Sequence, residues 1–120
     1  MRAKLPILAA VMAGLALPAG AHDLSYDECV EGSDFIKHAA MSRDYGLSRD
    51  EFIGRLHGDL MAIRAFPPEL RWFAQDDDDA ALLVSHSERV FDEPRVPQIH
   101  QTEFFQACLT RIGEQARAEE

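Results

Sequence analysis

Residues 25–40 read SYDECVEGSDFIKHAA and contain the clearest helix signals in the chain. Ser25 and Glu28 form a capping box, in which the Ser25 side chain accepts from the first turn of a helix and Glu28 reaches back to the cap. One helical face of the stretch is apolar and contains Cys29, Val30, Ile36, Ala39 and Ala40. We predict a helix that begins after Ser25 and ends at about Asp44, because Gly46 can adopt the left-handed conformation of a helix C-terminus.

The residues upstream of this stretch are typical of a secretory signal peptide. A positively charged start is followed by an apolar run, Leu5 to Leu17, and by Ala19-Gly20-Ala21, which has the small-residue pattern of a signal-peptidase site. The apolar run is too short to cross a membrane as a helix, which takes about 20 residues. We therefore expect cleavage of residues 1–21, one helical domain at residues 22–120, no membrane anchor, and a soluble protein of the periplasm, with secretion as the alternative.

Cys29 in the first helix and Cys108 near the C-terminus are the two cysteines of the chain. Cys108 lies in a second apolar stripe at helical spacing, with Phe104, Phe105, Leu109 and Ile112. Two cysteines in an exported protein are typical of one disulfide, with free thiols or a metal site as the alternatives. We predict a Cys29–Cys108 bond that joins the first helix to the last. The expected fold is all-α, a small bundle of four or five helices closed by this disulfide.

Ser48–Glu51 is a second capping box and predicts a second helix. Its expected apolar face contains Phe52, Ile53, Leu56, Leu60 and Ile63. This helix should end before Pro67, because the residue before a proline avoids the helical conformation. Pro68 can then begin a short helix that extends to Gln75.

Four carboxylates, Asp76–Asp79, precede the next apolar stretch. The last of them are suited to the N-cap and first turn of a helix that extends to about Phe91, because the helix dipole favours anions there. Residues 92–97 contain two prolines and should form a loop. We expect the last helix to begin near Gln101 and the charged residues 114–120 to fray.

Acidic residues dominate the composition. The whole chain has a formal charge of −9, and without Arg2 and Lys4 it has 10 Lys and Arg against 21 Asp and Glu, a charge of about −11. Such a charge argues against nucleic acid and anionic lipid as partners, since both need a positive surface. A protein partner or unfolded clients, including basic ones, remain compatible with it. The sequence indicates no oligomeric state.

The carboxylates at expected helix starts, the Asp76–Asp79 run among them, should have depressed pKa values in the folded chain. A depressed folded pKa gives stability that is present above the unfolded pKa and is lost as the pH falls through the folded value. We therefore expect the fold to loosen between about pH 4 and pH 2, with the disulfide still joining its ends.

No motif in the chain carries a recognisable catalytic or cofactor chemistry. Nucleophile-elbow, metalloprotease and phosphate-loop patterns are missing from the sequence, so we expect no catalytic residues, no cofactor and no enzyme activity. His22 is the exception to consider, because cleavage after Ala21 would give it a free amine beside its imidazole, a pair that can bind Cu(II). The alternative is that His22 simply follows the cleavage site and binds no metal.

Residues 66–73 read FPPELRWF and concentrate aromatic and proline residues. Such a stretch forms either a packed corner or a recognition surface. A partly exposed Trp72 next to Arg71 would be typical of an interface anchor. The candidate interaction surface is Phe66, Arg71, Trp72 and Phe73.

Residues 40–48, AMSRDYGLS, resemble a segment of small exported two-cysteine helical proteins of Proteobacteria that have no assigned activity. In architecture the expected fold is also remotely similar to periplasmic acid-stress chaperones of the HdeA type, which are small, helical and joined by one disulfide, although their short cysteine spacing is not matched here. This likeness implies a non-catalytic binding role that is acid-responsive and chaperone-like. The alternative is an inhibitor or immunity protein that binds a basic periplasmic hydrolase.

Overall fold

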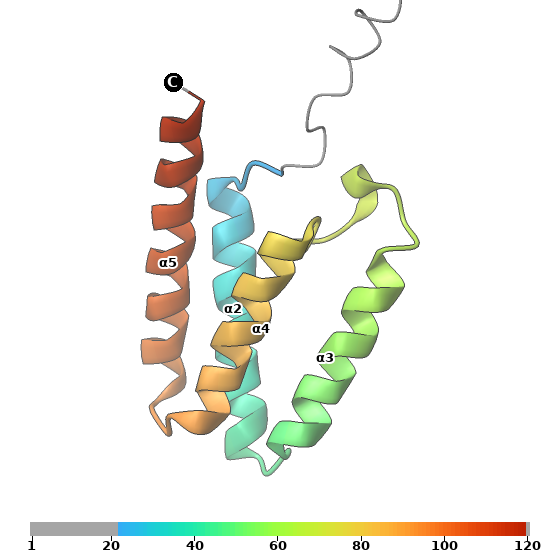
Figure 1. Cartoon of the computed structure of the whole chain (residues 1–120). Helices are drawn as coiled ribbons and strands as arrows, with labels where there is room; N and C mark the ends of the chain where they lie inside the picture. Colours follow the sequence, from blue (N-terminus) through green and yellow to red (C-terminus); the bar gives the residue numbers. More distant parts are fainter. Residues whose placement is uncertain (1–21, 120) are drawn as a thin grey trace, which may run out of the picture.

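The computed structural model describes residues 22–119, and the expected signal peptide, residues 1–21, lies outside the described residues. The described part of the chain folds into helices α2 (Tyr26–Asp44), α3 (Arg49–Ile63), α4 (Asp77–Asp92) and α5 (Pro97–Ala118), with a short 3-10 helix η1 (Pro68–Leu70) (Figure 1). It contains no strand within those residues. The predicted all-α fold is confirmed.

Helices α2 and α3 begin at the two predicted capping boxes. Ser25 Oγ accepts from the backbone N–H of Glu28, and the Glu28 carboxylate accepts from the backbone N–H of Ser25. The same pair of contacts joins Ser48 and Glu51 at the start of α3. Gly46 has a φ of 104° between the two helices, a left-handed conformation that glycine adopts without strain.

Three predicted helix boundaries are wrong. The short helix expected at residues 68–75 is one 3-10 turn, Pro68–Leu70, because the chain extends from Arg71 onward to bring Phe73 into the core. The last helix begins at Pro97 rather than near Gln101, since a proline needs no hydrogen-bond acceptor at the first helical position. The same helix continues to Ala118, so residues 114–118 are helical in place of the expected frayed tail.

The Asp76–Asp79 run also differs from expectation. Its first residue, Asp76, is the N-cap of α4 and accepts from the backbone N–H of Asp79. Asp79 lies in the first turn of α4, as expected of the last carboxylates, but its side chain is fully buried. This burial places a carboxyl group in the protein interior.

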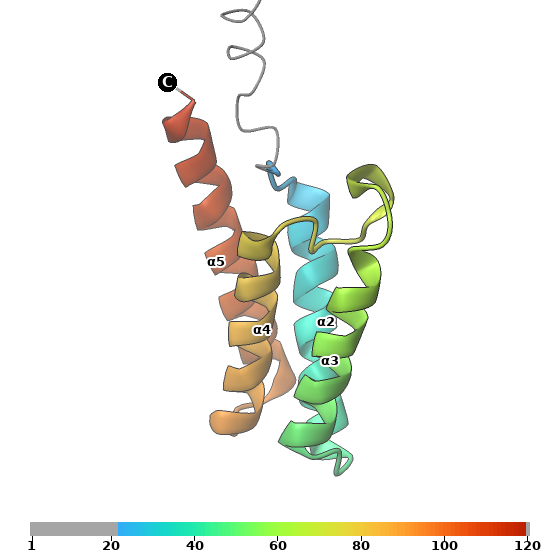
Figure 2. The same cartoon turned by 45° about the vertical axis from the view of Figure 1, so that its right-hand side comes forward.

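Helices α2, α4 and α5 lie side by side and form the centre of the bundle (Figures 1 and 2). The predicted disulfide is confirmed between Cys29 of α2 and Cys108 of α5, with an S–S distance of 2.08 Å and a Cα–Cα distance of 5.6 Å. Both cysteines are fully buried. The bond therefore joins the first and last helices within the core.

Gly32 allows a close approach between α2 and the aromatic rings of the core. A Cβ atom at this position would lie 2.5 Å from Phe104 Cε1 and 3.2 Å from a ring carbon of Phe73. Phe73 and Phe104 are both buried, with ring centroids 5.6 Å apart. The glycine thus makes room for two aromatic rings between α2 and its neighbours.

Helix α3 is the least buried helix of the bundle. Among its residues only Ile53 and Leu56 are buried, and its main packing partner is α4. The two helices diverge toward the C-terminal end of α3 (Figure 1). This arrangement leaves α3 as a cover on one side of the three-helix centre.

Within residues 22–119 no helix combines the length and the apolar character that a membrane-crossing segment needs.

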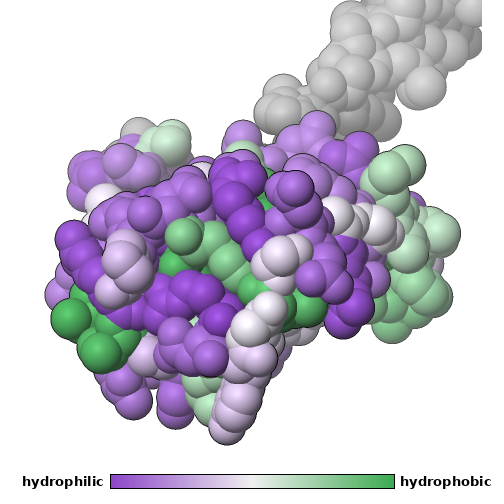
Figure 3. All heavy atoms as spheres, turned by 90° about the horizontal axis from the view of Figure 1, so that it is seen from below, coloured by the Kyte–Doolittle hydropathy of each residue, from purple (hydrophilic) through white to green (hydrophobic). Residues whose placement is uncertain are grey.

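Figure 3 views the end of the molecule that carries the turn between α2 and α3. Hydrophilic residues cover most of this end, and hydrophobic residues gather in separate areas.

Candidate functional site

The four residues of the expected interaction surface have different environments. Phe66 is exposed, with 54% of its surface accessible, whereas Phe73 is 1% exposed and belongs to the core. Arg71 and Trp72 are half-buried. The structure therefore does not bring the four side chains together on one surface.

Arg71 organises the loop between α3 and α4. Its guanidinium donates to the backbone carbonyls of Phe66 at 2.8 Å, Gln75 at 2.7 Å and Arg64 at 3.2 Å. These three hydrogen bonds satisfy carbonyl groups that have no helical partner. The Arg71 guanidinium is therefore hydrogen-bonded within the loop.

Trp72 belongs to a continuous row of aromatic rings. Its indole packs against Phe35 of α2 and Phe73, with centroids 5.4 and 5.8 Å apart, while Nε1–H donates to Glu31 at 3.0 Å. Neighbouring rings throughout this row have centroids 5.4 to 5.8 Å apart. In order along the row, the rings are Phe91, Phe52, Phe35, Trp72, Phe73 and Phe104. We call these six residues the aromatic row.

The aromatic row connects every helix of the described bundle. Phe52 is the member that α3 supplies, and it lies between Phe35 of α2 and Phe91 of α4. Aromatic pairs at such spacings contribute about 0.5–1.5 kcal/mol beyond the area they bury. The row runs from the covered core at Phe104 to half-buried rings next to α3. A displacement of α3 would expose this latter part.

Ion pairs attach both ends of α3 to α4. At its start, Arg49 contacts Glu88 at 3.2 Å and Asp92 at 3.0 Å. At its end, Arg64 pairs with Asp77. All five side chains are solvent-exposed, and the hydrogen bond with Asp92 raises the pKa of Arg49 above its ordinary value.

A groove of about 330 Å³ lies between the last turns of α3 and the first turns of α4. Its lining consists of His57, Leu60, Met61, Arg64, Asp77, Ala80, Ala81 and Val84. Met61 on its edge is exposed, as are Phe66 and Leu70 in the residues that follow. This end of the molecule therefore presents apolar side chains to solvent.

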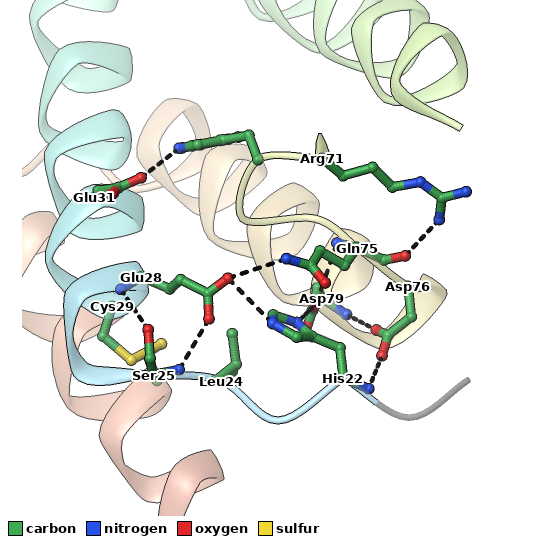
Figure 4. Close-up of polar contacts among 12 residues, drawn as sticks. His22, Leu24, Ser25, Glu28, Cys29, Glu31, Arg71, Gln75, Asp76 and Asp79 are labelled. Atoms are coloured by element: carbon green, nitrogen blue, oxygen red, sulfur yellow. Dashed lines mark hydrogen bonds and ion pairs between the residues drawn. A yellow bond between two sulfur atoms is a disulfide. The ribbon is translucent and has the colours of Figure 1, made fainter. Parts of the chain in front are cut away.

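A second cluster of polar groups surrounds His22, the first described residue. His22 Nδ1 lies 2.5 Å from Asp79 Oδ2, and Nε2 lies 3.1 Å from Glu28 Oε2 (Figure 4). The backbone nitrogen of His22 donates to Asp76 Oδ2 at 3.0 Å. With Gln75 and Gln115, these residues form what we call the His22 site.

Asp79 is the buried carboxylate of the His22 site. Its Oδ2 accepts from the backbone N–H of Gln75 at 3.2 Å, and its Oδ1 is buried without a hydrogen-bond partner. Burial raises the pKa of Asp79, and the neighbouring charge of Asp76 adds to this effect, whereas the contact with His22 opposes it. The expectation of a depressed pKa is therefore wrong for Asp79, because this residue points into the protein.

The raised pKa of Asp79 has a defined effect on stability. A carboxyl group with a raised folded pKa contributes stability that is present at low pH and is lost as the pH rises through the folded pKa. Asp79 therefore opposes acid loosening, and any such loosening must come from other groups.

Gln115 connects the His22 site to α5. Its Nε2 donates to the backbone carbonyl of His22 at 2.9 Å, and its Oε1 accepts from the backbone N–H of the buried Leu24 at 3.0 Å. The site thus includes groups from α2, α4 and α5. No group of three or more His, Cys, Asp or Glu side chains within residues 22–119 has an arrangement that could hold a metal ion.

The sequence indicates His22 through its metal chemistry, but the carboxylates around it were not predicted. The Asp76–Asp79 run could have predicted that Asp76 and Asp79 lie close together. The N-cap of a helix and the residue three positions later lie on the same side of its first turn. The aromatic row left no such signal, since its members are distributed over five separate segments.

Comparison with protein-family models, with curated proteins and with solved structures finds no significant match to this chain.

Proposed function

We propose that this protein is an exported, non-catalytic binding protein that opens in acid and binds unfolded client proteins through its aromatic row. The observation that carries the proposal is the attachment of α3. This helix covers half-buried rings of the row, buries few residues of its own, and is joined to α4 at both ends by exposed ion pairs.

Acid weakens these ion pairs by protonating their carboxylates. Arginine keeps its charge throughout the accessible pH range, whereas carboxyl groups ordinarily become neutral below about pH 4. Neutral partners at Glu88, Asp92 and Asp77 leave Arg49 and Arg64 without their attraction to α4. Each exposed pair contributes little by itself, so the response depends on how few apolar residues α3 buries.

Opening of α3 would expose an apolar surface on a part of the protein that stays folded. Phe35 and Phe91 would lose their contact with Phe52 when it moves away with α3, and Trp72 packs against Phe35 beside this newly exposed surface. The disulfide continues to join α2 to α5 under these conditions. Aromatic side chains on a folded support bind apolar segments of unfolded chains at a low cost in conformational entropy.

The proposal is tested by replacing carboxylates with uncharged amides, which removes their charge as acid does. A variant with Glu88→Gln and Asp92→Asn removes both anionic partners of Arg49 without changing side-chain size. Its matched control carries Glu114→Gln and Glu119→Gln, two exposed residues toward the end of the chain. Both variants lose two negative charges.

Light scattering of aggregating malate dehydrogenase is the measurement, taken from pH 7 to pH 3. We expect the wild-type protein and the control to suppress scattering only in acid, and the test variant to do so at a pH closer to neutral. Absence of protection by the wild-type protein at any pH, or identical pH profiles for both variants, would contradict the proposal.

A second candidate function is inhibition of a basic periplasmic hydrolase at neutral pH. Three exposed apolar side chains near the α3–η1 junction favour it: Met61, Phe66 and Leu70. Together with the acidic composition, they are suited to a partner with a basic surface around an apolar centre. Titration calorimetry with purified basic muramidases would test it, since stoichiometric binding that Phe66→Ala weakens is expected here and is not expected of an acid chaperone.

A further inference from the structure

The backbone nitrogen of His22 lies in an unusually anionic environment. It donates to Asp76 Oδ2 at 3.0 Å, and the side chain of the same residue contacts Asp79 and Glu28. In the uncleaved chain this nitrogen belongs to an uncharged peptide group. Cleavage after Ala21 would convert it into an α-ammonium group with three N–H donors and a full positive charge.

We propose that signal-peptide cleavage completes the His22 site, because the new α-ammonium group of His22 forms an ion pair with Asp76 that stabilises the mature fold. The inference rests on cleavage after Ala21 and is independent of client binding. It assigns a structural role to the processed N-terminus itself.

Charge balance favours this pairing. Three carboxyl groups lie at the site, and the His22 imidazole contacts two of them. Arg111 lines the pocket beside His22 but forms its ion pair with Asp78. Both ring nitrogens face carboxylate oxygens, so the two contacts need a proton on each nitrogen or on a carboxyl group. An α-ammonium group adds a positive charge at the nitrogen that already contacts Asp76.

Burial favours it as well. The His22 side chain is 15% exposed and Asp79 is fully buried, so charges at the site are screened less than on an open surface. Asp76 is half-buried, so an ion pair between its carboxylate and the His22 nitrogen forms in this partly shielded environment.

The position of the site explains why the pair would matter for the whole fold. Glu28 belongs to α2, Asp79 to α4 and Gln115 to α5, and Asp76 caps α4. The first residue of the mature chain would thus join the three central helices near the Cys29–Cys108 bond. Helix α3 has no part in the site, so its opening would leave the pair intact.

A displaced N-terminus tests the ion pair. The exported protein that begins at His22 is compared with a variant that keeps one additional Ala before His22, which moves the ammonium group by one residue, about 3.8 Å. We expect the displaced form to unfold at a temperature lower by about 3–8 °C. In the Asp76→Asn background the two forms should unfold within about 1 °C of each other, since the charge of the partner is gone.

Two controls separate this effect from general destabilisation. Asp76→Asn keeps an oxygen acceptor for the N-cap of α4, and Asp76→Ser serves if the asparagine variant folds poorly. Asp23→Asn removes a neighbouring exposed charge, and the effect of displacement should persist in it.

The reactivity of the α-amine gives a readout that stability alone does not affect. At pH 8 reductive methylation of the His22 amine should be slower in the wild-type protein than in Asp76→Asn, because pairing favours the charged, unreactive form. Equal methylation rates, equal unfolding temperatures of the two N-terminal forms, or a mature protein whose mass shows a start other than His22 would overturn the inference.

Discussion

Gly32 is a residue at which the addition of a single methyl group should destabilise the fold. Its absent side chain leaves room for Phe104, and a Cβ there would lie 2.5 Å from the ring. We expect Gly32→Ala to lower the free energy of unfolding by about 1–3 kcal/mol, measured in urea. Gly54→Ala is the matched control, because a Cβ atom at this exposed helical glycine would meet no other residue within 4 Å. It should raise stability by about 0.5–1 kcal/mol, and equal effects at the two sites would contradict the packing described here.

His86 is a buried base whose titration should weaken the fold in mild acid. Burial lowers the pKa of His86, and the charges of Arg89 and His100 lower it further, while Glu103 opposes them. Its ring packs edge-on against Phe104 at 5.3 Å. A lowered folded pKa gives stability that is present above about pH 6.5 and is lost as the pH falls through the folded pKa.

Replacement of His86 should therefore flatten the pH dependence of stability below about pH 6.5. Urea denaturation of His86→Gln between pH 7.5 and pH 5 is the measurement. The control is His57→Gln, which changes an exposed histidine of α3 and should keep the wild-type slope. Parallel pH profiles for wild-type and His86→Gln would show that this group does not contribute.

At the scale of helices, the disulfide is the main constraint on how α2 and α5 pack. Cys29 and Cys108 are separated by 79 positions, so the bond removes much of the conformational freedom of the unfolded chain. We expect the double variant Cys29→Ala, Cys108→Ala to lose about 2–5 kcal/mol of stability in urea, and its acid loosening to begin at a higher pH. A double variant as stable as the wild-type protein would mean that helix packing alone closes the bundle.

The starts of α2 and α3 were predictable because each depends on residues within one turn. Ser25 with Glu28, and Ser48 with Glu51, form hydrogen bonds that sequence spacing alone specifies. The disulfide was predictable because two cysteines on helical apolar faces have one way to pair.

Features that depend on distant residues were not predictable. The loop after η1 follows from the three carbonyls that Arg71 binds, and no local pattern indicates them. The burial of Asp79 follows from the position of His22 on a separate segment. Proximity of these groups results from helix packing, which the sequence pattern leaves open.

At the scale of the whole molecule, the proposed function requires one part of the protein that stays folded in acid and one helix that moves. Helices α2, α4 and α5 are joined by the disulfide and by the His22 site, whereas α3 is attached through Phe52, two buried residues and exposed ion pairs. Acid should therefore open one side of the molecule before it unfolds the rest.

Trp72 allows this central claim to be measured directly, because it is the single tryptophan of the chain and belongs to the aromatic row. The measurement is acrylamide quenching of its fluorescence between pH 7 and pH 2, with and without an unfolded client. We predict that quenching increases below about pH 4 while the disulfide stays intact, and that the client reverses the increase. Quenching that is unchanged down to pH 2, or that increases equally with and without the client, would contradict the account.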